Sequence, residues 1–560
     1  MNSIQKLEFE ITELFKRREY SKVIFEITSR TEENERSAFL CNILGLSRIT
    51  YNKKSKDALT AAIKDFKFGY LREKNTVHAI DSLANFITTN ILLIDVEENH
   101  DFDFNEILNY YKLSEKHCIN HRPINLAMAM VYRRLNDAKK LIFHFGKVID
   151  SKKFNVIDLC NYGYSQCFDK EWDQSDFFNY GKFLDQNLRV IPQNQLVEIR
   201  QEPGSKTRVG FLSADIIQGH SITYFLKSIL TNYNKKKLEI FLFLNNPKED
   251  QSTEKFRNLV DQTINISNLD NVSALNKVRE LKIDIMIDLM GYTSTQRLEL
   301  FKNRMAKKQI IWMGYCNTTG LKNMDYIISD PNLIYPSEEK FYSEKVIYLP
   351  KIWNAHCGFD FERKENLPPL IKNNYITFGS FNNPSKISEN VIFCWSKILK
   401  KIKNSKLIIK CSNDKKKLDR IERLLKEKEI LGSVIFHKRF DDKKEHLNLY
   451  NEVDIALDTF PYNGVTTSFE AIWMGVPVLT MAGYNFNSRC GESINKNLNM
   501  EQLIAKNEED YIQKLVNLTN NHNTYINLRK SVFLDAVKSP LFNSQDYSKS
   551  FFEALEKIAK

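Results

Sequence analysis

The chain has 560 residues, enough for two to four domains, and its 42% hydrophobic and 27% charged residues are ordinary for a protein with sizeable cores. The net charge of +11 comes from lysines with acidic residues close by, so we expect a solvated surface and no nucleic-acid partner. The nine cysteines include no C-x-x-C pair, which argues against a disulfide framework and a zinc ribbon. The sequence shows no signal-peptide pattern, and no uncharged apolar run approaches ~18 residues, so we expect no membrane span. Together these features predict a cytoplasmic protein.

Residues 1–195 carry apolar side chains at helical spacing and almost no strand-like run. Short polar connections with few prolines predict antiparallel helical hairpins stacked side by side. The stretch from Leu44 and Gly45 to Phe66 resembles a degraded tetratricopeptide unit, but no second copy follows at a period of about 34 residues. We therefore expect an all-α domain of irregular hairpins, with true tetratricopeptide repeats as the alternative, and either would offer a surface for protein or peptide partners.

Short β-prone apolar runs begin after Pro203 and Gly204 and alternate with helical segments, first over residues 207–360 and again over 373–540. This alternation predicts β-α-β units with parallel sheets that are buried on both faces. The fold class is therefore α/β, with two doubly wound units that face a cleft and a final helix over 541–560. The expected strands are 208–215, 238–244, 283–289, 309–313, 326–329 and 346–349, then 376–381, 407–411, 434–437, 453–457 and 476–480.

The most informative loop follows the expected strand 453–457 and contains Asn463-Gly464-Val465-Thr466-Thr467. Thr467 and Glu470, three residues apart, predict a capping box at the start of a helix. The free N–H groups of such a helix, at the carboxyl edge of a parallel sheet, form an anion site suited to a diphosphate. Glu470 has a second interpretation, in which its carboxylate reaches a pair of ribose hydroxyls.

Two further loops place ionisable side chains at strand ends. Lys386 precedes Ser388, the expected cap of the next helix, and a lysine there can neutralise a departing phosphate. An ordinary surface lysine is the alternative. His220 lies at a strand-to-helix junction, where an imidazole can serve as a general base, and a structural histidine that caps the helix is the alternative.

Two weaker loops end strands with glycine and threonine, at Tyr292-Thr293 and at Thr318-Thr319. Alone, neither predicts a function. The sequence contains no phosphate loop of the G-x-x-x-x-G-K-[ST] type, no H-E-x-x-H and no G-x-S-x-G, so we expect no metal, no cofactor and no nucleophilic serine of those classes.

In their order along residues 207–540, these segments resemble the protein O-GlcNAc transferase and SPINDLY-like glycosyltransferases, a class that includes the bacterial cytosolic N-glycosyltransferases. The similar segments are 209–215 with His220, 291–293 with Arg297 and 299–301, 312–315, 324–330, Phe381 and Asn382 with Lys386, and 458–477. The helical residues 1–195 occupy the place of that family's tetratricopeptide superhelix.

The resemblance implies a GT-B fold and a metal-independent inverting transfer from a nucleotide sugar bound mostly to the second unit. Lys386 would bind the diphosphate and stabilise the leaving group, and His220 would be the proposed base near the acceptor. The other expected donor-binding residues are His446, which would stack on the base, Glu470 on the ribose, and Asn463, Gly464, Thr466 and Thr467 around the phosphates. Tyr292, Thr293, Thr318 and Thr319 would lie on the acceptor and sugar side.

Two positions depart from the family pattern. Val465 stands where animal members have a histidine, and Cys316-Asn317 replaces a Pro-Gly turn.

The expected reaction moves N-acetylglucosamine from UDP-GlcNAc to Ser or Thr hydroxyls of proteins. The alternatives are transfer from UDP-glucose to Asn, from GDP-fucose to protein hydroxyls, transfer to a non-protein acceptor, or an inactive helical-repeat scaffold.

Overall fold

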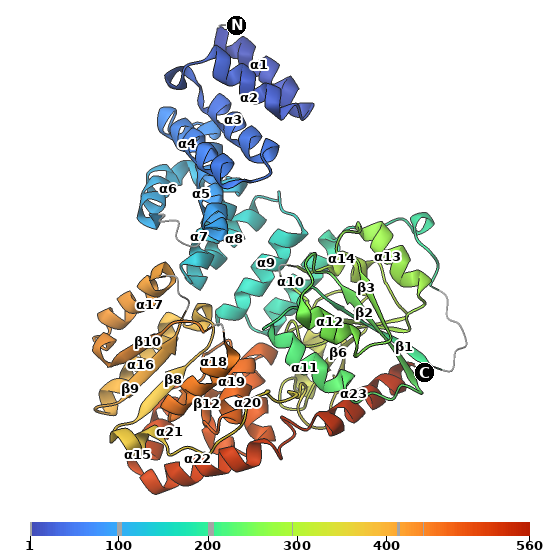
Figure 1. The fold of residues 1–560 in the computed structure, drawn as a ribbon, viewed down its shortest axis with the longest axis vertical. Coiled ribbons are helices and arrows are strands. Elements are labelled where there is room, and N and C mark those ends of the chain that lie inside the picture. The colour runs from blue at the N-terminus through green and yellow to red at the C-terminus, as the bar shows by residue number, and fades with distance from the viewer. Residues whose placement is uncertain are drawn as a thin grey trace. The chain divides into compact units, whose positions relative to one another are not determined.

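The computed structural model describes residues 3–97, 103–199, 206–293, 295–411, 415–440 and 442–559, without the side chains of 415–417. Helices occupy the first third of the chain, and two parallel sheets with their covering helices follow (Figure 1). The expected α/β architecture with a preceding all-α part is confirmed.

The first part consists of helical hairpins. Its helices are α1 (Ser3–Lys16), α2 (Tyr20–Arg30), α3 (Ala38–Tyr51), α4 (Lys56–Arg72), α5 (Val77–Val96), α6 (Phe104–Cys118), α7 (Arg122–Arg134) and α8 (Ala138–Asp150). Side-chain oxygens of Ser37, Ser55 and Thr76 cap α3, α4 and α5, which is why these helices begin where they do. A Cβ atom on Gly45 would lie 2.5 Å from the Phe66 ring, so α3 and α4 approach closely because residue 45 is glycine.

Helix α5 is, within the described part of the chain, the one helix long and apolar enough to cross a membrane by length and composition. Buried residues make up 61% of its most apolar window, as in the core helix of a helical domain. Its composition is therefore weak evidence for a span.

The first sheet has seven parallel strands in the order β3-β2-β1-β4-β5-β6-β7. Its strands are β1 (Thr207–Ser213), β2 (Leu238–Leu244), β3 (Gln262–Asn265), β4 (Ile285–Asp288), β5 (Lys308–Ile311), β6 (Tyr326–Ser329) and β7 (Lys345–Tyr348). Val209 in the central strand pairs with Ile240 on one side and Ile285 on the other. Its helices are α11 (Ser221–Leu230), α12 (Gln251–Arg257), α13 (Asn271–Glu280) and α14 (Leu298–Lys302).

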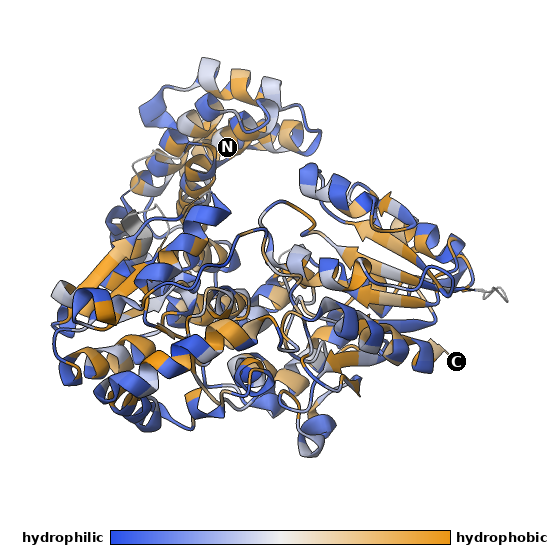
Figure 2. Cartoon of the chain, turned by 60° about the horizontal axis from the view of Figure 1, so that its bottom comes forward, coloured by the Kyte–Doolittle hydropathy of each residue, from blue (hydrophilic) through white to orange (hydrophobic). Residues whose placement is uncertain are grey.

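The second sheet has six parallel strands in the order β10-β9-β8-β11-β12-β13. Its strands are β8 (Thr377–Ser380), β9 (Lys406–Lys410), β10 (Val434–His437), β11 (Ile455–Leu457), β12 (Val478–Met481) and β13 (Ile504–Ala505). Its helices are α15 (Pro369–Asn373), α16 (Glu389–Lys401), α17 (Lys415–Glu427), α18 (Lys443–Asn448), α19 (Thr466–Trp473), α20 (Phe486–Asn497), α21 (Glu508–Asn520) and α22 (His522–Ala536). The strands are largely hydrophobic, and hydrophilic residues gather on the surrounding helices (Figure 2).

The final helix α23 (Ser544–Ala559) returns to the first sheet, where Ser548 Oγ donates to the carbonyl of Ile229 in α11 at 3.0 Å. Tyr547 donates its hydroxyl proton to the carbonyl of Trp353 at 2.5 Å. The last helix of the chain therefore packs on the first sheet, against α11.

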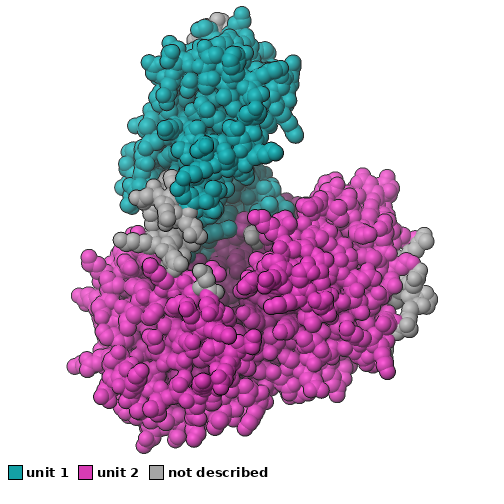
Figure 3. All heavy atoms as spheres, in the orientation of Figure 1, with its two compact units in different colours: residues 1–158 teal, residues 159–560 magenta. Residues whose placement is uncertain are grey.

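The chain divides into two compact units, residues 1–158 and 159–560 (Figure 3). The boundary falls inside α9 (Val156–Ser165), earlier than the residue 195 expected from the change in sequence texture. Helix α10 (Gln174–Asn187) packs on the first sheet, because Gly181 lies against Gly320 and Lys302 forms an ion pair with Asp185 at 2.8 Å. Both sheets and the segment from 159 onward thus form one unit.

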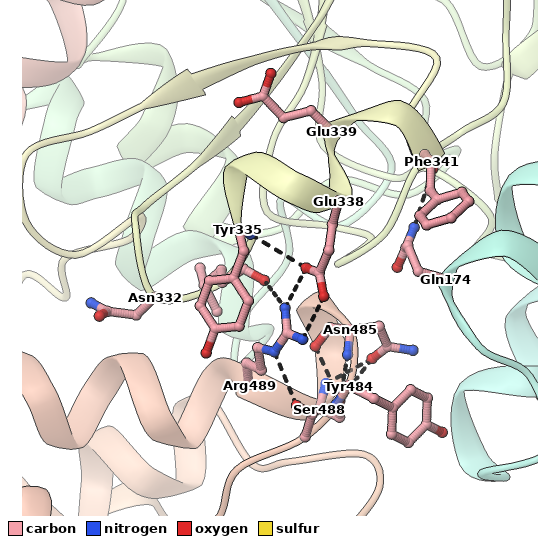
Figure 4. Close-up of polar contacts among 12 residues, drawn as sticks. Gln174, Asn332, Tyr335, Glu338, Glu339, Phe341, Tyr484, Asn485, Ser488 and Arg489 are labelled. Atoms are coloured by element: carbon pink, nitrogen blue, oxygen red, sulfur yellow. Dashed lines mark hydrogen bonds and ion pairs between the residues drawn. The ribbon is translucent and has the colours of Figure 1, made fainter.

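A set of polar contacts joins the two sheets within this unit. Arg489 of α20 holds both oxygens of Glu338 at 2.6 and 2.8 Å and stands over the ring of Tyr335 (Figure 4). Ser493, one turn further along, donates to Asp330 at 2.6 Å. A bidentate pair and a buried hydrogen bond fix α20 against the first sheet, beside the loops that form the candidate site.

Candidate active site

Lys386 lies in a short 3-10 turn (Pro384–Lys386) between β8 and α16. Ser388 caps α16 as expected, accepting from the N–H of Val391 at 3.2 Å. The Lys386 ammonium donates to the backbone carbonyl of Asn463 at 2.7 Å and stands 3.8 Å from the centre of the Tyr462 ring. Burial lowers the pKa of this amine, and the Asp458 carboxylate acts in the opposite direction. Lys386 is therefore not an ordinary surface lysine.

Asp458 organises the loop that carries Asn463 and Gly464. Its carboxylate accepts from the N–H of Gly464 at 2.7 Å, the N–H of Thr459 at 2.9 Å and the hydroxyl of Thr480 at 2.7 Å. Burial raises its pKa to about 6, although these hydrogen bonds act to lower it. Asp458 is absent from the residues predicted for the site, although an acidic residue directly after a strand is a signal at this edge of a sheet.

Asn463 and Gly464 serve this loop as framework. The side-chain amide of Asn463 donates to the carbonyl of Thr459 at 2.9 Å. Its backbone carbonyl accepts the hydrogen bond from Lys386. A Cβ atom on Gly464 would lie 2.5 Å from side-chain oxygens of Asn382 and Thr467, so this position requires glycine. Both residues thus lie between Lys386 and the start of α19, and their contact with the phosphates stays a prediction.

The expected capping box at Thr467 and Glu470 is wrong. Helix α19 begins at Thr466, and Val465 occupies the cap position without a side-chain hydrogen bond. Thr467 is already inside the helix, and its hydroxyl donates to the Asn382 side chain at 2.8 Å. The N–H groups of Thr466 and Thr467 have no intrahelical acceptor by geometry, so the free helix end is present without the box, and its binding of an anion stays a prediction.

Glu470 instead belongs to a chain of five charged or polar groups, of which Glu470, His446 and Tyr450 are buried. Its carboxylate accepts from Lys443, from His446 Nε2 at 2.8 Å and from the Tyr450 hydroxyl at 3.2 Å. Lys410 Nζ lies 2.8 Å from His446 Nδ1. Burial would raise the pKa of Glu470, but the hydrogen bond from His446 and the charge of Lys443 hold it below its ordinary value.

His446 is buried, and its ring packs edge-on against Tyr450 with 5.7 Å between ring centres. Burial lowers the pKa of this histidine. Because the Lys410 ammonium can only donate, Nδ1 accepts and the proton of the neutral ring lies on Nε2. Stacking of this ring on a nucleobase stays a prediction.

His220 is the cap residue of α11, as its alternative interpretation predicted. Its Nδ1 accepts from the N–H of Ile222 at 3.5 Å, a long contact, and its Nε2 lies 3.8 Å from Asp215 Oδ1. The side chain remains 38% exposed, so an acceptor could still reach it. Burial raises the pKa of Asp215, and the charge of His220 opposes that shift.

Three of the four residues expected on the sugar side have their polar atoms paired inside the first sheet's own loops. The Tyr292 hydroxyl donates to the carbonyl of Thr319 at 2.7 Å. The hydroxyls of Thr318 and Thr319 both donate to the buried carboxylate of Glu344. These hydroxyls are already paired within the protein, and the placement of the three residues on the sugar side stays a prediction.

Thr293, the fourth, is half-buried. Its hydroxyl has no hydrogen-bond partner among the described residues. It is the one residue of this set that keeps a polar group unused in the described part of the chain.

The model of glycosyl transferase family 41 matches residues 188–357 and 365–551, more than half of the chain. The chain belongs to glycosyl transferase family 41. It is 30% identical over 376 residues to a tomato (Solanum lycopersicum) protein and 32% identical over 373 residues to an Arabidopsis thaliana protein, both named "Probable UDP-N-acetylglucosamine--peptide N-acetylglucosaminyltransferase SPINDLY". The matches cover 65% and 64% of this chain and 40% of each relative, so the chain spans well under half of their length.

A solved structure of a mutant O-GlcNAc transferase from Thermobaculum terrenum shares the fold of this family 41 chain. It superposes with a TM-score of 0.77 at 20% identity and covers 94% of this chain and 98% of its own. The two facing parallel sheets are therefore the GT-B arrangement of glycosyltransferases.

The aromatic residues that contact the Tyr462 ring precede the matched family 41 ranges. Tyr164 of α9 and Phe168 of the following turn lie with their ring centres 6.4 and 5.2 Å from that of Tyr462. Both lie in the part of the sequence predicted to form helical hairpins, and neither was predicted as a site residue. Among the described residues, no three histidine, cysteine, aspartate or glutamate side chains cluster as metal ligands.

Proposed function

We propose that this family 41 glycosyltransferase transfers N-acetylglucosamine from UDP-GlcNAc to Ser or Thr hydroxyls of proteins, with inversion at the anomeric carbon. The carrying observation is the position of Lys386, whose ammonium meets the Asn463 carbonyl beside the first N–H groups of α19. The names of the SPINDLY relatives support the choice of sugar and of a peptide acceptor.

The chemistry needs positive charge where UDP departs. As the bond between the anomeric carbon and the β-phosphate breaks, negative charge grows on the diphosphate. Lys386 and the N–H groups of Thr466 and Thr467 would meet that charge from fixed positions, which costs no reorganisation during the reaction. Thr467 is held in place by its bond to Asn382.

The ribose would bind at Glu470. Both carboxylate oxygens already accept hydrogen bonds, one from Lys443 and the other from His446 and Tyr450. Lys443 is 38% exposed and is the partner that can leave, whereas His446 is buried. A ribose hydroxyl pair would therefore take the place of the Lys443 ammonium on Glu470.

The acceptor hydroxyl must lose a proton as it attacks. His220 is our candidate base, because its side chain is accessible and Asp215 lies behind it. While Nδ1 accepts from Ile222, the ring proton lies on Nε2, and the ring has no second lone pair for the acceptor. Release of that long 3.5 Å contact would free the lone pair at small energetic cost.

A panel of donors tests the proposal. Purified chain is incubated with UDP-GlcNAc, UDP-glucose and GDP-fucose, and thermal protection, donor hydrolysis and transfer to a peptide library are measured. UDP-GlcNAc should protect and be consumed, and sugar should appear on Ser or Thr. Protection by GDP-fucose or UDP-glucose instead, or sugar on Asn, would replace the donor or acceptor assigned here. No protection by any nucleotide would leave a scaffold without transferase activity.

The remaining assignments follow from the same proposal. The helical residues 1–158 would present protein or peptide acceptors, and the enzyme would work in the cytoplasm without metal, membrane or nucleic acid. Addition of EDTA should then leave the transfer rate unchanged.

A further inference from the structure

The ammonium of Lys386 is held by two groups of the same loop. Its Nζ donates one hydrogen bond to the Asn463 carbonyl at 2.7 Å and lies 3.8 Å above the centre of the Tyr462 ring. An ammonium over an aromatic face is attracted by the negative face of the ring, most strongly where water is excluded. Of its three N–H groups, two then remain for a phosphate.

The Tyr462 ring is fixed in turn by residues that lie almost 300 positions earlier in the chain. Phe168 packs against it at 5.2 Å between ring centres, and Tyr164 contacts it edge-on at 6.4 Å. The hydroxyls of Tyr164 and Tyr462 lie 3.4 Å apart. These partners come from α9 and the turn after it, which precede the first sheet.

The same segment is anchored to both sheets. Cys167 accepts at its carbonyl from the Asn487 side chain at 3.5 Å, and the Asp169 carbonyl accepts from the Tyr484 hydroxyl at 3.1 Å, both from the second sheet. Gln174 donates to the Asn317 side chain at 2.8 Å on the first sheet. The position of the Tyr462 partners is therefore set by contacts with both sheets.

We propose that Tyr462 is a positioning residue for Lys386, and that the segment 159–174, through Tyr164 and Phe168, completes the donor site by fixing that ring. The proposal rests on the proposed function, in which Lys386 stabilises the departing nucleotide. It adds a requirement, because the two sheets alone would lack the rings of Tyr164 and Phe168, which hold the Tyr462 ring in place.

Other titratable side chains lie around Lys386 in addition to the Tyr462 ring. Besides the Asp458 carboxylate, they are the thiols of Cys167, Cys316 and Cys490. Burial raises the pKa of the Cys167 and Cys490 thiols, so both are neutral near pH 7. Among these groups the carboxylate of Asp458 supplies the negative charge. Its oxygens accept hydrogen bonds from Gly464, Thr459 and Thr480. The Tyr462 ring face and the Asn463 carbonyl are the groups in direct contact with the ammonium.

A labelling experiment tests this without any nucleotide sugar. The full chain and the variants Tyr462→Phe and Tyr462→Leu are acetylated with a trace of acetic anhydride across a pH series, and modification at Lys386 is quantified by mass spectrometry. Phenylalanine keeps the ring, so the labelling midpoint should stay at the wild-type value. Leucine keeps the site apolar but removes the ring, so the midpoint should move down by roughly one pH unit.

A midpoint in Tyr462→Leu equal to that of the wild type would overturn the proposal. If Tyr462→Leu does not fold, judged by circular dichroism, Phe168→Leu provides the second variant, since it loosens the ring without touching Lys386. It should shift the midpoint in the same direction by a smaller amount, and an unchanged midpoint there would count equally against the proposal.

Kinetics then separate positioning from packing. With the donor that the panel identifies, Tyr462→Leu should lower kcat about tenfold with little change in KM, and Tyr462→Phe should stay within about twofold. In a Lys386→Ala background, Tyr462→Leu should have no further effect, because the group it positions is gone. Equal losses in both backgrounds would assign Tyr462 to packing. If no donor is turned over, the proposed function fails, while the labelling result still decides the role of Tyr462.

Discussion

His446 Nε2 lies 2.8 Å from Glu470 Oε2, and the opposite nitrogen of the same ring lies 2.8 Å from Lys410 Nζ. The neutral ring therefore bridges an ammonium and a carboxylate, and these two partners fix its tautomer. With Lys443 on the other carboxylate oxygen, the chain joins β9, α18 and α19, the three elements that surround the expected nucleoside site.

Replacing Glu470 by glutamine should lower the free energy of unfolding by about 3 kcal/mol at neutral pH, because the half-buried ammonium groups of Lys443 and Lys410 lose the carboxylate that offsets their charge. The folded-state pKa of Glu470 lies below its ordinary value, so this contribution is present at neutral pH. It is lost as the pH falls through the folded-state pKa. Urea unfolding at neutral and acidic pH measures the difference. The control is Glu445→Gln, on the exposed face of α18, which should be close to neutral.

The lowered pKa of Lys410 predicts that the free energy of unfolding changes with pH on the alkaline side. Burial lowers its pKa to about 8 from 10.5, so the folded chain releases this proton before the unfolded chain does. Wild-type stability should therefore rise with pH, relative to Lys410→Met, by up to about 3 kcal/mol across that window. Unfolding curves of the two proteins at matched pH values give the difference. Parallel pH profiles would show that Lys410 titrates normally.

The sheets could be predicted because their strands are continuous apolar runs buried on both faces. Val209 to Leu212 and Leu238 to Leu244 are examples that periodicity alone identifies. The strands that were missed lack this signal. β3 (Gln262–Asn265) is a half-exposed edge strand with two polar ends, and β13 (Ile504–Ala505) has only two residues.

The loops of the site were found because ligands bind at the carboxyl ends of parallel strands, and this brought Lys386 and Asn463 together as expected. Their partners could not be found in the same way. Glu344 takes the hydroxyls of Thr318 and Thr319 from a separate segment, and Phe168 reaches Tyr462 from the helical part of the sequence. Such contacts depend on tertiary packing between segments that share no local pattern.

Lys386→Ala should reduce kcat by about 10²- to 10³-fold, the loss expected when one fixed electrostatic donor is removed, or about 3 kcal/mol of transition-state stabilisation. Steady-state kinetics with the donor identified by the panel measure it. Lys401→Ala, an exposed lysine at the end of the following helix, is the control and should keep full activity. Full turnover in Lys386→Ala would remove this lysine from the mechanism.

His220 combines a cap with a candidate base, and two substitutions separate the roles. Asparagine also caps helices, so His220→Asn should keep the melting temperature while it lowers kcat by about 10²- to 10⁴-fold. His220→Ala should lose similar activity and about 1 kcal/mol of stability as well. Thermal unfolding and transfer rates of both variants decide the question. A fully active His220→Asn enzyme would leave the cap as the sole role and place the base elsewhere.

Val465 stands at the start of α19 and supplies no polar group to the helix end. Val465→His should place an imidazole N–H beside the free N–H groups of Thr466 and Thr467, where a diphosphate would lie. We expect the affinity for UDP to rise about three- to tenfold, the value of one added hydrogen bond, and the affinity for uridine to stay unchanged. Calorimetry with both ligands measures the difference, and Val465→Leu controls for the change in size. An equal gain for UDP and uridine would place residue 465 near the nucleoside, and no gain for either would place the phosphates away from the start of α19.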